Sequence, residues 1–568
     1  MRTARRPTDA EHVPGDVHGD EVDNMGGVAF DAWDLPNAGT RRVDPPVPVR
    51  VKPGYRNGLI QNPAISPEDM PGSTAWGYDA DFDPAYEQTQ SWEIGRASTV
   101  AARKPPAAWS VRVLAPAMPG MVVVWGGMFQ LVYTTTDMAH AGWPALLVAA
   151  VYSVISIWLC LYLSIHLQGG DRLLLAAILA LAAISLVCNW ALEPVVLASR
   201  STREAAALHG FAFKQTVIVV FGLSTLGIVA STMSLSWLRR RSYLAAALAA
   251  VGVGLTIAVD SQWLSIPVIG TNIQPSELLK LGLILFVSAY ADEQASRIRG
   301  RHSGWQIGRL RMPPVPALLP ILITLGGALA LIKIQGDLGL ALLCYGTVVF
   351  VLYQAARRTS YLLAGLGLFA GVVWVLTMFL PGMLGTAPER VKIWLDPYHY
   401  GNDAGQQIVM SFYSLATGRW FGTGLTYGRP YFIPEVQTDF IASAIGETWG
   451  LIGIAVVLAL YSILMWRGMG ASARVRNGFE SLLAGGIAVA ITLQVLVIMG
   501  GTSGVIPLSG VTLPLISAGG SSFLTTCFAL GLLLRISANA SQKAVGVTHD
   551  HEYAFYEDDK DEEYDEAG

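Results

Sequence analysis

The chain has 568 residues, of which 52% are hydrophobic and only 14% are charged, and its mean hydropathy is +0.44. This composition is too apolar for a water-soluble globular protein and is typical of an integral membrane protein. The formal net charge of −4 excludes the strongly basic surface of a nucleic-acid-binding protein, so no nucleic acid is expected as a partner.

The first segment, residues 1–110, is rich in Pro, Gly, Asp and Arg and lacks a sustained apolar period. No short apolar core followed by small residues lies near its start, so it does not resemble a cleaved signal peptide. We interpret it as a disordered N-terminal tail on the cytoplasmic side of the membrane.

Twelve stretches after residue 110 are apolar and long enough to be transmembrane helices. They are 111–133, 143–167, 173–199, 214–238, 242–259, 276–292, 314–332, 337–355, 360–382, 440–466, 479–500 and 515–537. The expected fold is an all-α polytopic membrane domain over residues 111–540. The four cysteines all lie inside these stretches, which favours small core residues over disulfides or a thiolate metal site.

Positive charge predicts the orientation of the spans. Clusters such as Arg239 to Arg241, and the five arginines between residues 297 and 311, fall on one side of the membrane, which we therefore expect to be cytoplasmic. With twelve spans, both termini are cytoplasmic. One loop departs from this pattern, because residues 200–214 carry the positive charges of Arg200, Arg203 and Lys214 on the predicted outer side.

Two further segments differ from the spans. Residues 383–439 form a long loop with turn residues and many aromatic side chains, which predicts a folded cap on the extracytoplasmic face. Residues 541–568 include the acidic run 557–563 and are expected to be a solvated cytoplasmic C-terminal tail.

Ionisable residues inside apolar spans are costly and mark candidate sites. Glu277 and Lys280 are three residues apart on one helical face and can pair in the interior. Spacing alone leaves a purely structural ion pair and a functional pair equally favoured. Asp337 lies at the start of a span, where a helix-capping role is favoured over a catalytic one.

A second acidic group occupies the end of the long loop. Glu435 and Asp439 lie beside an apolar surface at the membrane boundary, where desolvation can raise a carboxyl pKa into the working range of a general base. A simple N-cap role for Asp439 is equally compatible with the spacing. In a helix starting there, Glu447 would lie about 12 Å deeper along the axis.

Six short motifs occur in order between residues 260 and 537, covering about half of the chain. They are Gln274-Pro275-Ser276-Glu277, Asp337-Leu338-Gly339, Trp394-Leu395-Asp396-Pro397, Pro434-Glu435 with Thr438-Asp439-Phe440-Ile441, Gly446-Glu447 with Gly450-Leu451-Ile452-Gly453, and Pro514-Leu515-Ile516-Ser517 with Gly519-Gly520-Ser521-Ser522. Together they resemble the SEDS family, which includes the FtsW, RodA and SpoVE proteins. Known members have ten spans, so the resemblance implies two extra N-terminal spans here.

The resemblance implies a peptidoglycan glycosyltransferase that polymerises lipid II, a polyprenyl-diphosphate-linked disaccharide pentapeptide, at the outer face of the bacterial cytoplasmic membrane. The essential aspartate of the family matches Asp439, which becomes the expected catalytic base. Other family positions match Glu277, Lys280, Asp337 and Trp263. The resemblance also implies a class B penicillin-binding protein transpeptidase as partner.

Leaving-group stabilisation requires positive charge, and Arg390, Lys392 and Lys280 are candidates for binding pyrophosphate. A divalent cation could share that task, although no carboxylate cluster in the sequence requires one. The remaining residues of the expected substrate-binding set are Glu435, Gln407 and Glu447.

Two alternative functions remain open at this point. One is a lipid II flippase, because internal charges and broken spans also describe transporters. The other is a non-catalytic scaffold for the transpeptidase. Division and elongation subfamilies are also both open, since FtsW proteins often have Lys at the position of Ser509.

Overall fold

The computed structural model describes residues 111–134, 138–167, 169–199, 210–259, 264–266, 271–299, 306–307, 310–311, 315–379, 387–400 and 405–565. The chain divides into two compact units, 1–85 and 86–568, and all described residues belong to the second unit. The predicted N-terminal tail and Trp263 lie outside the described residues, so the disorder of the tail stays a prediction.

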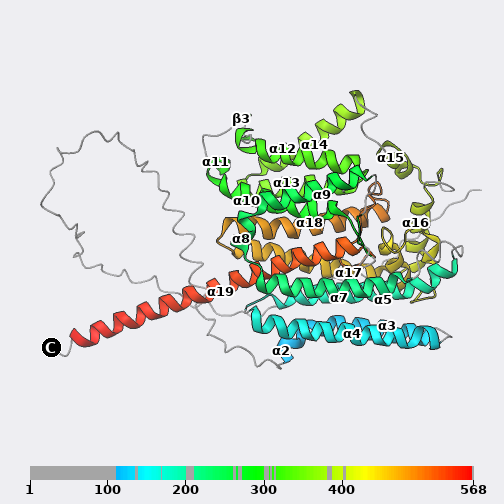
Figure 1. The fold of residues 1–568 in the computed structure, drawn as a ribbon, viewed down its shortest axis with the longest axis horizontal. Coiled ribbons are helices and arrows are strands. Elements are labelled where there is room, and N and C mark those ends of the chain that lie inside the picture. Colours follow the sequence, from blue (N-terminus) through cyan, green and yellow to red (C-terminus); the bar gives the residue numbers. More distant parts are fainter. Residues whose placement is uncertain are drawn as a thin grey trace, which may run out of the picture. The chain divides into compact units, whose positions relative to one another are not determined.

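An α-helix occupies each of the twelve predicted spans (Figure 1). These helices are α3 (Met118–Thr134), α4 (Met138–His166), α5 (Arg172–Ser199), α7 (Phe211–Thr232), α9 (Ser242–Ala258), α10 (Pro275–Glu293), α12 (Val315–Ile334), α13 (Leu338–Ala356), α14 (Thr359–Phe379), α17 (Ile441–Arg474), α18 (Gly478–Thr502) and α19 (Gly520–Asp565). The start of the last helix differs from the prediction, because residues 515–519 are a turn. Its end differs too, because α19 continues into the predicted acidic tail.

Within the described residues, ten helices are long and apolar enough to cross a membrane. Of the twelve predicted spans, α9 and α10 fall outside this count. Helix α9 has only 17 residues, whereas α10 carries four charged side chains, Glu277, Lys280, Asp292 and Glu293. The all-α membrane fold is therefore confirmed, and α10 is a buried helix of the bundle that carries an interior ion pair.

Short elements connect the long helices. Ahead of α3 lie α2 (Val111–Leu114) and the 3₁₀ helix η1 (Ala115–Ala117), and further along lie α8 (Leu235–Arg240), α11 (Ala295–Arg299), α15 (Ala387–Leu395), α16 (Gln406–Gly418) and the 3₁₀ helix η3 (Pro430–Phe432). Two antiparallel hairpins, β1 (Leu264–Ile266) with β2 (Thr271–Ile273) and β3 (Gln306–Ile307) with β4 (Leu310–Arg311), add strands that the sequence does not predict. The predicted cap thus contains α15, α16 and η3.

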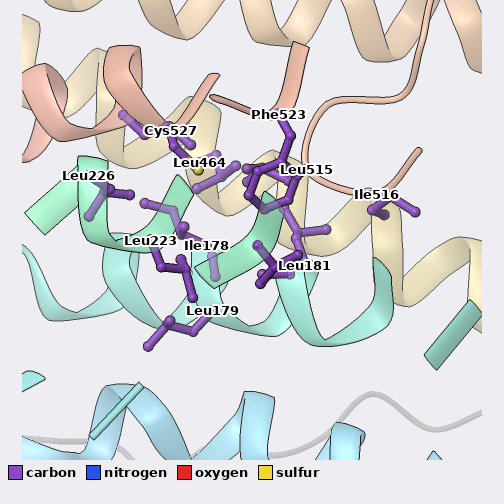
Figure 2. Close-up of a cluster of buried hydrophobic side chains, with 14 of the residues drawn as sticks. Ile178, Leu179, Leu181, Leu223, Leu226, Leu464, Leu515, Ile516, Phe523 and Cys527 are labelled. Atoms are coloured by element: carbon purple, nitrogen blue, oxygen red, sulfur yellow. The ribbon is translucent and has the colours of Figure 1, made fainter. Parts of the chain in front are cut away.

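The core lies where α5, α7, α17 and α19 pack together, and Figure 2 shows part of it. Close helix packing depends on small residues. A side chain at Gly222 of α7 would collide with the ring of Phe523 on α19. The turn ahead of α19 also enters this core, because Leu515 and Ile516 are buried in the same cluster as Leu181 and Phe523.

The two ends of the helix bundle differ in chemistry. In Figure 1, α15 and α16 of the long loop lie at one end, and α8 and α11 lie at the opposite end. Helices α8 and α11 carry Arg239, Arg240, Arg297 and Arg299. The separation of these basic residues from the long loop agrees with the predicted topology, and the assignment of the loop end to the outside stays a prediction.

Candidate functional site

A tight turn positions Asp439 immediately before α17. The carbonyl oxygen of Glu435 accepts hydrogen bonds from the backbone N–H groups of Thr438 and Asp439, both at 3.1 Å. Glu435 itself has a φ of 55°, which is uncommon for a residue with a Cβ. Helix α17 is capped by Phe440 without any side-chain hydrogen bond. The structure therefore does not use Asp439 as the N-cap.

Asp439 meets two other segments of the chain at one glycine. A Cβ added to Gly510, in the loop between α18 and α19, would lie 3.7 Å from Oδ2 of Asp439 and 3.8 Å from Nη1 of Arg390. Nη1 of Arg390 donates hydrogen bonds to the carbonyl oxygens of Leu508, at 3.2 Å, and Ser509, at 2.9 Å. The carboxylate of Asp439 and the guanidinium of Arg390 thus lie beside the same glycine. The sequence does not predict Gly510 as part of this site.

The environment of Asp439 suits a general base. The pKa of Asp439 is raised to about 6, mainly by burial and in addition by the negative charges of Glu435 and Asp337. The hydroxyl of Thr438 and the positive charge of Arg390 lower it. A carboxylate with a pKa near 6 is largely ionised at neutral pH and is still basic enough to accept a proton efficiently.

Asp337 caps α13, as its position at the start of a span predicts. Its Oδ1 accepts a hydrogen bond from the backbone N–H of Leu340 at 3.0 Å, and its Oδ2 accepts one from Gln274 at 3.5 Å. Burial raises the pKa of Asp337, the Leu340 N–H bond lowers it, and the charge of Glu277 raises it. The residue therefore contributes negative charge to the site besides its capping role.

Glu277 and Lys280 form the buried ion pair that their spacing predicts, with 2.7 Å between Oε2 and Nζ. Lys280 also donates a hydrogen bond to Oε1 of Gln494 at 2.9 Å, and Nε2 of Gln494 donates to the carbonyl oxygen of Thr512 at 2.8 Å. The pair is thus linked to the loop that carries Gly510. Gln494 is the only amide side chain in the predicted span 479–500, a signal that could have identified it from the sequence.

A small cavity lies beside this pair, between α10, α18 and α19. Glu277, Lys280, Gln494, Thr525 and Thr526 supply its polar lining. Its volume of about 30 Å³ admits water-sized molecules only. The cavity can hydrate the ion pair and is too small for a sugar.

Glu447 is buried in α17 and accepts hydrogen bonds from residues of the cap. Its carboxylate oxygens accept hydrogen bonds from Oγ of Ser414 on α16 and from the backbone N–H of Arg429, both at 2.5 Å. Its carbonyl oxygen accepts one from the N–H of Thr423 at 2.8 Å. These contacts favour a role for Glu447 in joining the long loop to α17.

A break in α17 receives part of the same loop. Gly450 has a φ of 67° and a ψ of −163°, a combination that is essentially restricted to glycine. Past this break, the N–H of Leu451 donates to the carbonyl oxygen of Arg419 at 2.9 Å, and that of Ile452 donates to Trp420 at 3.2 Å. Backbone groups released by the break are therefore satisfied by the cap.

Two further predicted residues, Lys392 and Gln407, lie on the helices of the cap. Lys392 is exposed on α15 and Gln407 is half-buried on α16. Among the described residues, no hydrogen bond or ion pair joins either of them to Asp439. In the same parts of the chain, no group of three or more His, Cys, Asp and Glu side chains is arranged to hold a metal ion.

Comparison with known proteins identifies related chains. Residues 171–542 match the family of FtsW, RodA and SpoVE, described as cell cycle proteins. Helices α3 and α4 precede the matched region. The peptidoglycan glycosyltransferase RodA of Mycobacterium bovis is 37% identical over 279 residues, which are 49% of this chain and 58% of that relative. The chain therefore spans less than two thirds of that relative.

Two further matches cover most of the related protein. The probable peptidoglycan glycosyltransferase FtsW of Allochromatium vinosum is 32% identical over 373 residues, which are 63% of this chain and 88% of that relative. A solved structure described as "Structural coordination of polymerization and crosslinking by a peptidoglycan synthase complex" aligns with a TM-score of 0.51 and 26% identity. That alignment covers 66% of this chain and 99% of the solved chain.

Proposed function

The chain belongs to the FtsW/RodA/SpoVE family, and from this membership we propose that it is a peptidoglycan glycosyltransferase that polymerises lipid II. The names of the RodA and FtsW relatives support this activity. The observation that carries the proposal is Asp439, a half-buried carboxylate with a pKa of about 6 that faces the same space as Arg390.

In the proposed reaction, Asp439 accepts the proton of the sugar hydroxyl that attacks the anomeric carbon of a second saccharide. The new glycosidic bond forms as the bond from that carbon to the polyprenyl diphosphate breaks, and the diphosphate leaves with the electron pair. Arg390, anchored by two backbone carbonyl groups, lies beside the base and can stabilise the departing negative charge.

The other predicted residues have supporting roles in this proposal. Lys280 and Lys392 add positive charge for the diphosphate, while Glu435, Asp337 and Glu277 set the electrostatics around the base. Gln407 and Trp263 are proposed to contact the saccharide.

Glu447 has an indirect role, because its carboxylate oxygens already accept hydrogen bonds from Ser414 and from the N–H of Arg429.

The proposal places the protein in the bacterial cytoplasmic membrane, with the site on the outer face and both termini in the cytoplasm. The multi-pass helical fold and the family support the membrane location. A class B penicillin-binding protein is the proposed partner, supported by the likeness to the chain of a peptidoglycan synthase complex.

The test is Asp439→Asn in the purified protein supplied with lipid II, with glycan chains resolved on a gel. The amide keeps the shape of the side chain but accepts no proton at neutral pH, so we expect polymerisation to fall by about 10²–10⁴-fold. Expression and transpeptidase binding should stay near those of the wild type.

The same variant separates the alternatives. A flippase should still move lipid II after this substitution, and a scaffold should still activate its partner. Polymerisation by Asp439→Asn at the wild-type rate would contradict the mechanism and would make Glu435 the next candidate for the base.

A further inference from the structure

Three buried polar side chains meet a backbone turn in the core. Ser185 and Asn189 of α5 are fully buried, and so is Gln215 of α7. The carbonyl oxygen of Ile516 accepts hydrogen bonds from Oγ of Ser185 at 2.8 Å and from Nδ2 of Asn189 at 3.3 Å. Nε2 of Gln215 donates to Oγ of Ser185 at 3.0 Å and to the carbonyl oxygen of Ser517 at 3.4 Å.

The turn that they hold, residues 513–519, is hereafter the Ser517 loop. On its other side it contacts the residues just before Asp439. Oγ of Ser517 donates a hydrogen bond to the carbonyl oxygen of Thr438 at 2.5 Å. The N–H of Ala518 donates to the carbonyl oxygen of Gln437 at 2.9 Å. The Ser517 loop therefore bridges the polar side chains of α5 and α7 to the segment that carries Asp439.

The same loop is held in a strained conformation. Leu515 has a φ of 63°, which is rare and unfavourable for a bulky residue. Its side chain is buried in the cluster of Figure 2 together with Leu181 and Phe523. Strain of this kind persists only where the surroundings determine the backbone strongly, as the apolar cluster and the three polar side chains do here.

Packing alone does not require these polar groups. Apolar side chains would fill this bundle at a lower cost in free energy, because each buried polar group must first be desolvated. We propose that Gln215, Ser185 and Asn189 are positioning residues, which hold Asp439 in its catalytic place through the Ser517 loop. This inference rests on the proposed function in naming Asp439 as the base.

The first test is Gln215→Met, which keeps the length of the side chain and removes its donors. A displacement of a catalytic group by about 1 Å can cost 10²-fold, so we expect the kcat for lipid II polymerisation to fall about 10- to 100-fold with little change in KM. If Asp439 is held less firmly, water reaches it more easily and its pKa falls. The acid limb of the pH profile should therefore also move to lower pH. A purely structural role would not move that limb.

Thr216→Val is the matched control. Thr216 is the next residue on α7 and is buried; its hydroxyl accepts a hydrogen bond from Nε1 of Trp190 and donates one to the carbonyl oxygen of Ala212. Within the described part of the chain, it makes no hydrogen bond to the Ser517 loop. This variant should keep the kcat and the pH profile of the wild type. Gln215→Met combined with Ser517→Ala should cost no more than the larger single effect, since both act along one path.

Hydrogen exchange supplies a readout that needs no activity. In Gln215→Met, but not in Thr216→Val, the backbone amides of residues 435–441, of Leu513 and of residues 515–519 should exchange faster in the folded, monodisperse protein. If the wild type polymerises no lipid II, the proposed function fails while exchange still tests the positioning. The inference is overturned if Gln215→Met leaves exchange in both segments unchanged, or lowers kcat with an unmoved acid limb.

Discussion

Asp439 and Glu435 show how two neighbouring carboxylates acquire different roles. Asp439 is half-buried and shares its space with Arg390, whereas Glu435 is exposed and accepts a hydrogen bond from Gln437 at 3.1 Å. The charge of Glu435 acts on Asp439 and raises its pKa. Glu435 therefore acts on the base through its charge, by raising the pKa of Asp439, and this role requires no contact with the reacting atoms.

This relationship predicts a pH dependence. The base works in its deprotonated form, so kcat/KM should be level above the pKa of Asp439, about 6, and should fall about tenfold per pH unit below it. Glu435→Gln removes a negative charge that raises this pKa, so the acid limb should move to lower pH. Polymerisation rates measured across pH would show the shift.

Glu389→Gln is the charge-matched control, because Glu389 is an exposed carboxylate on α15. Its acid limb should coincide with that of the wild type. An acid limb that stays in place in Glu435→Gln would contradict the electrostatic role assigned to Glu435.

At the scale of elements, α10 brings a buried ion pair into an apolar bundle. Breaking such a pair by removing one partner costs about 3–5 kcal/mol, because an uncompensated charge stays buried, whereas replacing both partners with apolar residues can be nearly neutral. Glu277→Gln and Lys280→Met should therefore each reduce thermal stability in detergent more than Glu277→Leu combined with Lys280→Leu.

Activity of the same variants separates the two roles of the pair. Recovery of stability without polymerisation in the double variant would indicate a part in substrate binding, consistent with the link through Gln494 to Thr512. Recovery of both would show that the pair serves the fold alone. A double variant less stable than both singles would contradict the desolvation argument.

The break in α17 gives a second prediction for an element. Gly450→Ala places a Cβ against the carbonyl group of Trp420 in a backbone conformation that disfavours any side chain. We expect a loss of at least about 1–3 kcal/mol, visible as a lower unfolding temperature. Gly367→Ala on α14 is the control, since its Cβ would come within 4 Å of no described atom beyond the neighbouring backbone of its own helix. Equal unfolding temperatures for the two variants would contradict the structural role of Gly450.

At the scale of the whole molecule, the separation of the long loop from α8 and α11 predicts accessibility. Tyr398 is exposed beyond α15, and Ser296 is exposed on α11. A membrane-impermeant maleimide should label Tyr398→Cys in intact cells and should label Ser296→Cys only after permeabilisation. The native cysteines are all buried, so background labelling should be low. Labelling of Ser296→Cys alone in intact cells would invert the proposed topology.

The sequence by itself determined the membrane architecture. A span needs about 20 apolar residues, which is a property of a continuous segment, so each of the twelve predicted spans contains a helix, although α19 starts and ends later than predicted. The pairing of Glu277 with Lys280 and the capping by Asp337 were predictable for the same reason, since both depend on neighbours within one helical turn. The family motifs then indicated Asp439.

Only the tertiary structure decided how these parts meet. It brought Asp439, Arg390 and Gly510 together from three separate segments, showed that Phe440 and not Asp439 caps α17, and placed Glu447 in the protein's own hydrogen-bond network. No local pattern encodes such contacts. They arise because packing helices closes long loops and buries groups whose partners lie far away in the chain, so the pKa of Asp439 and its usefulness as a base are properties of the assembled fold.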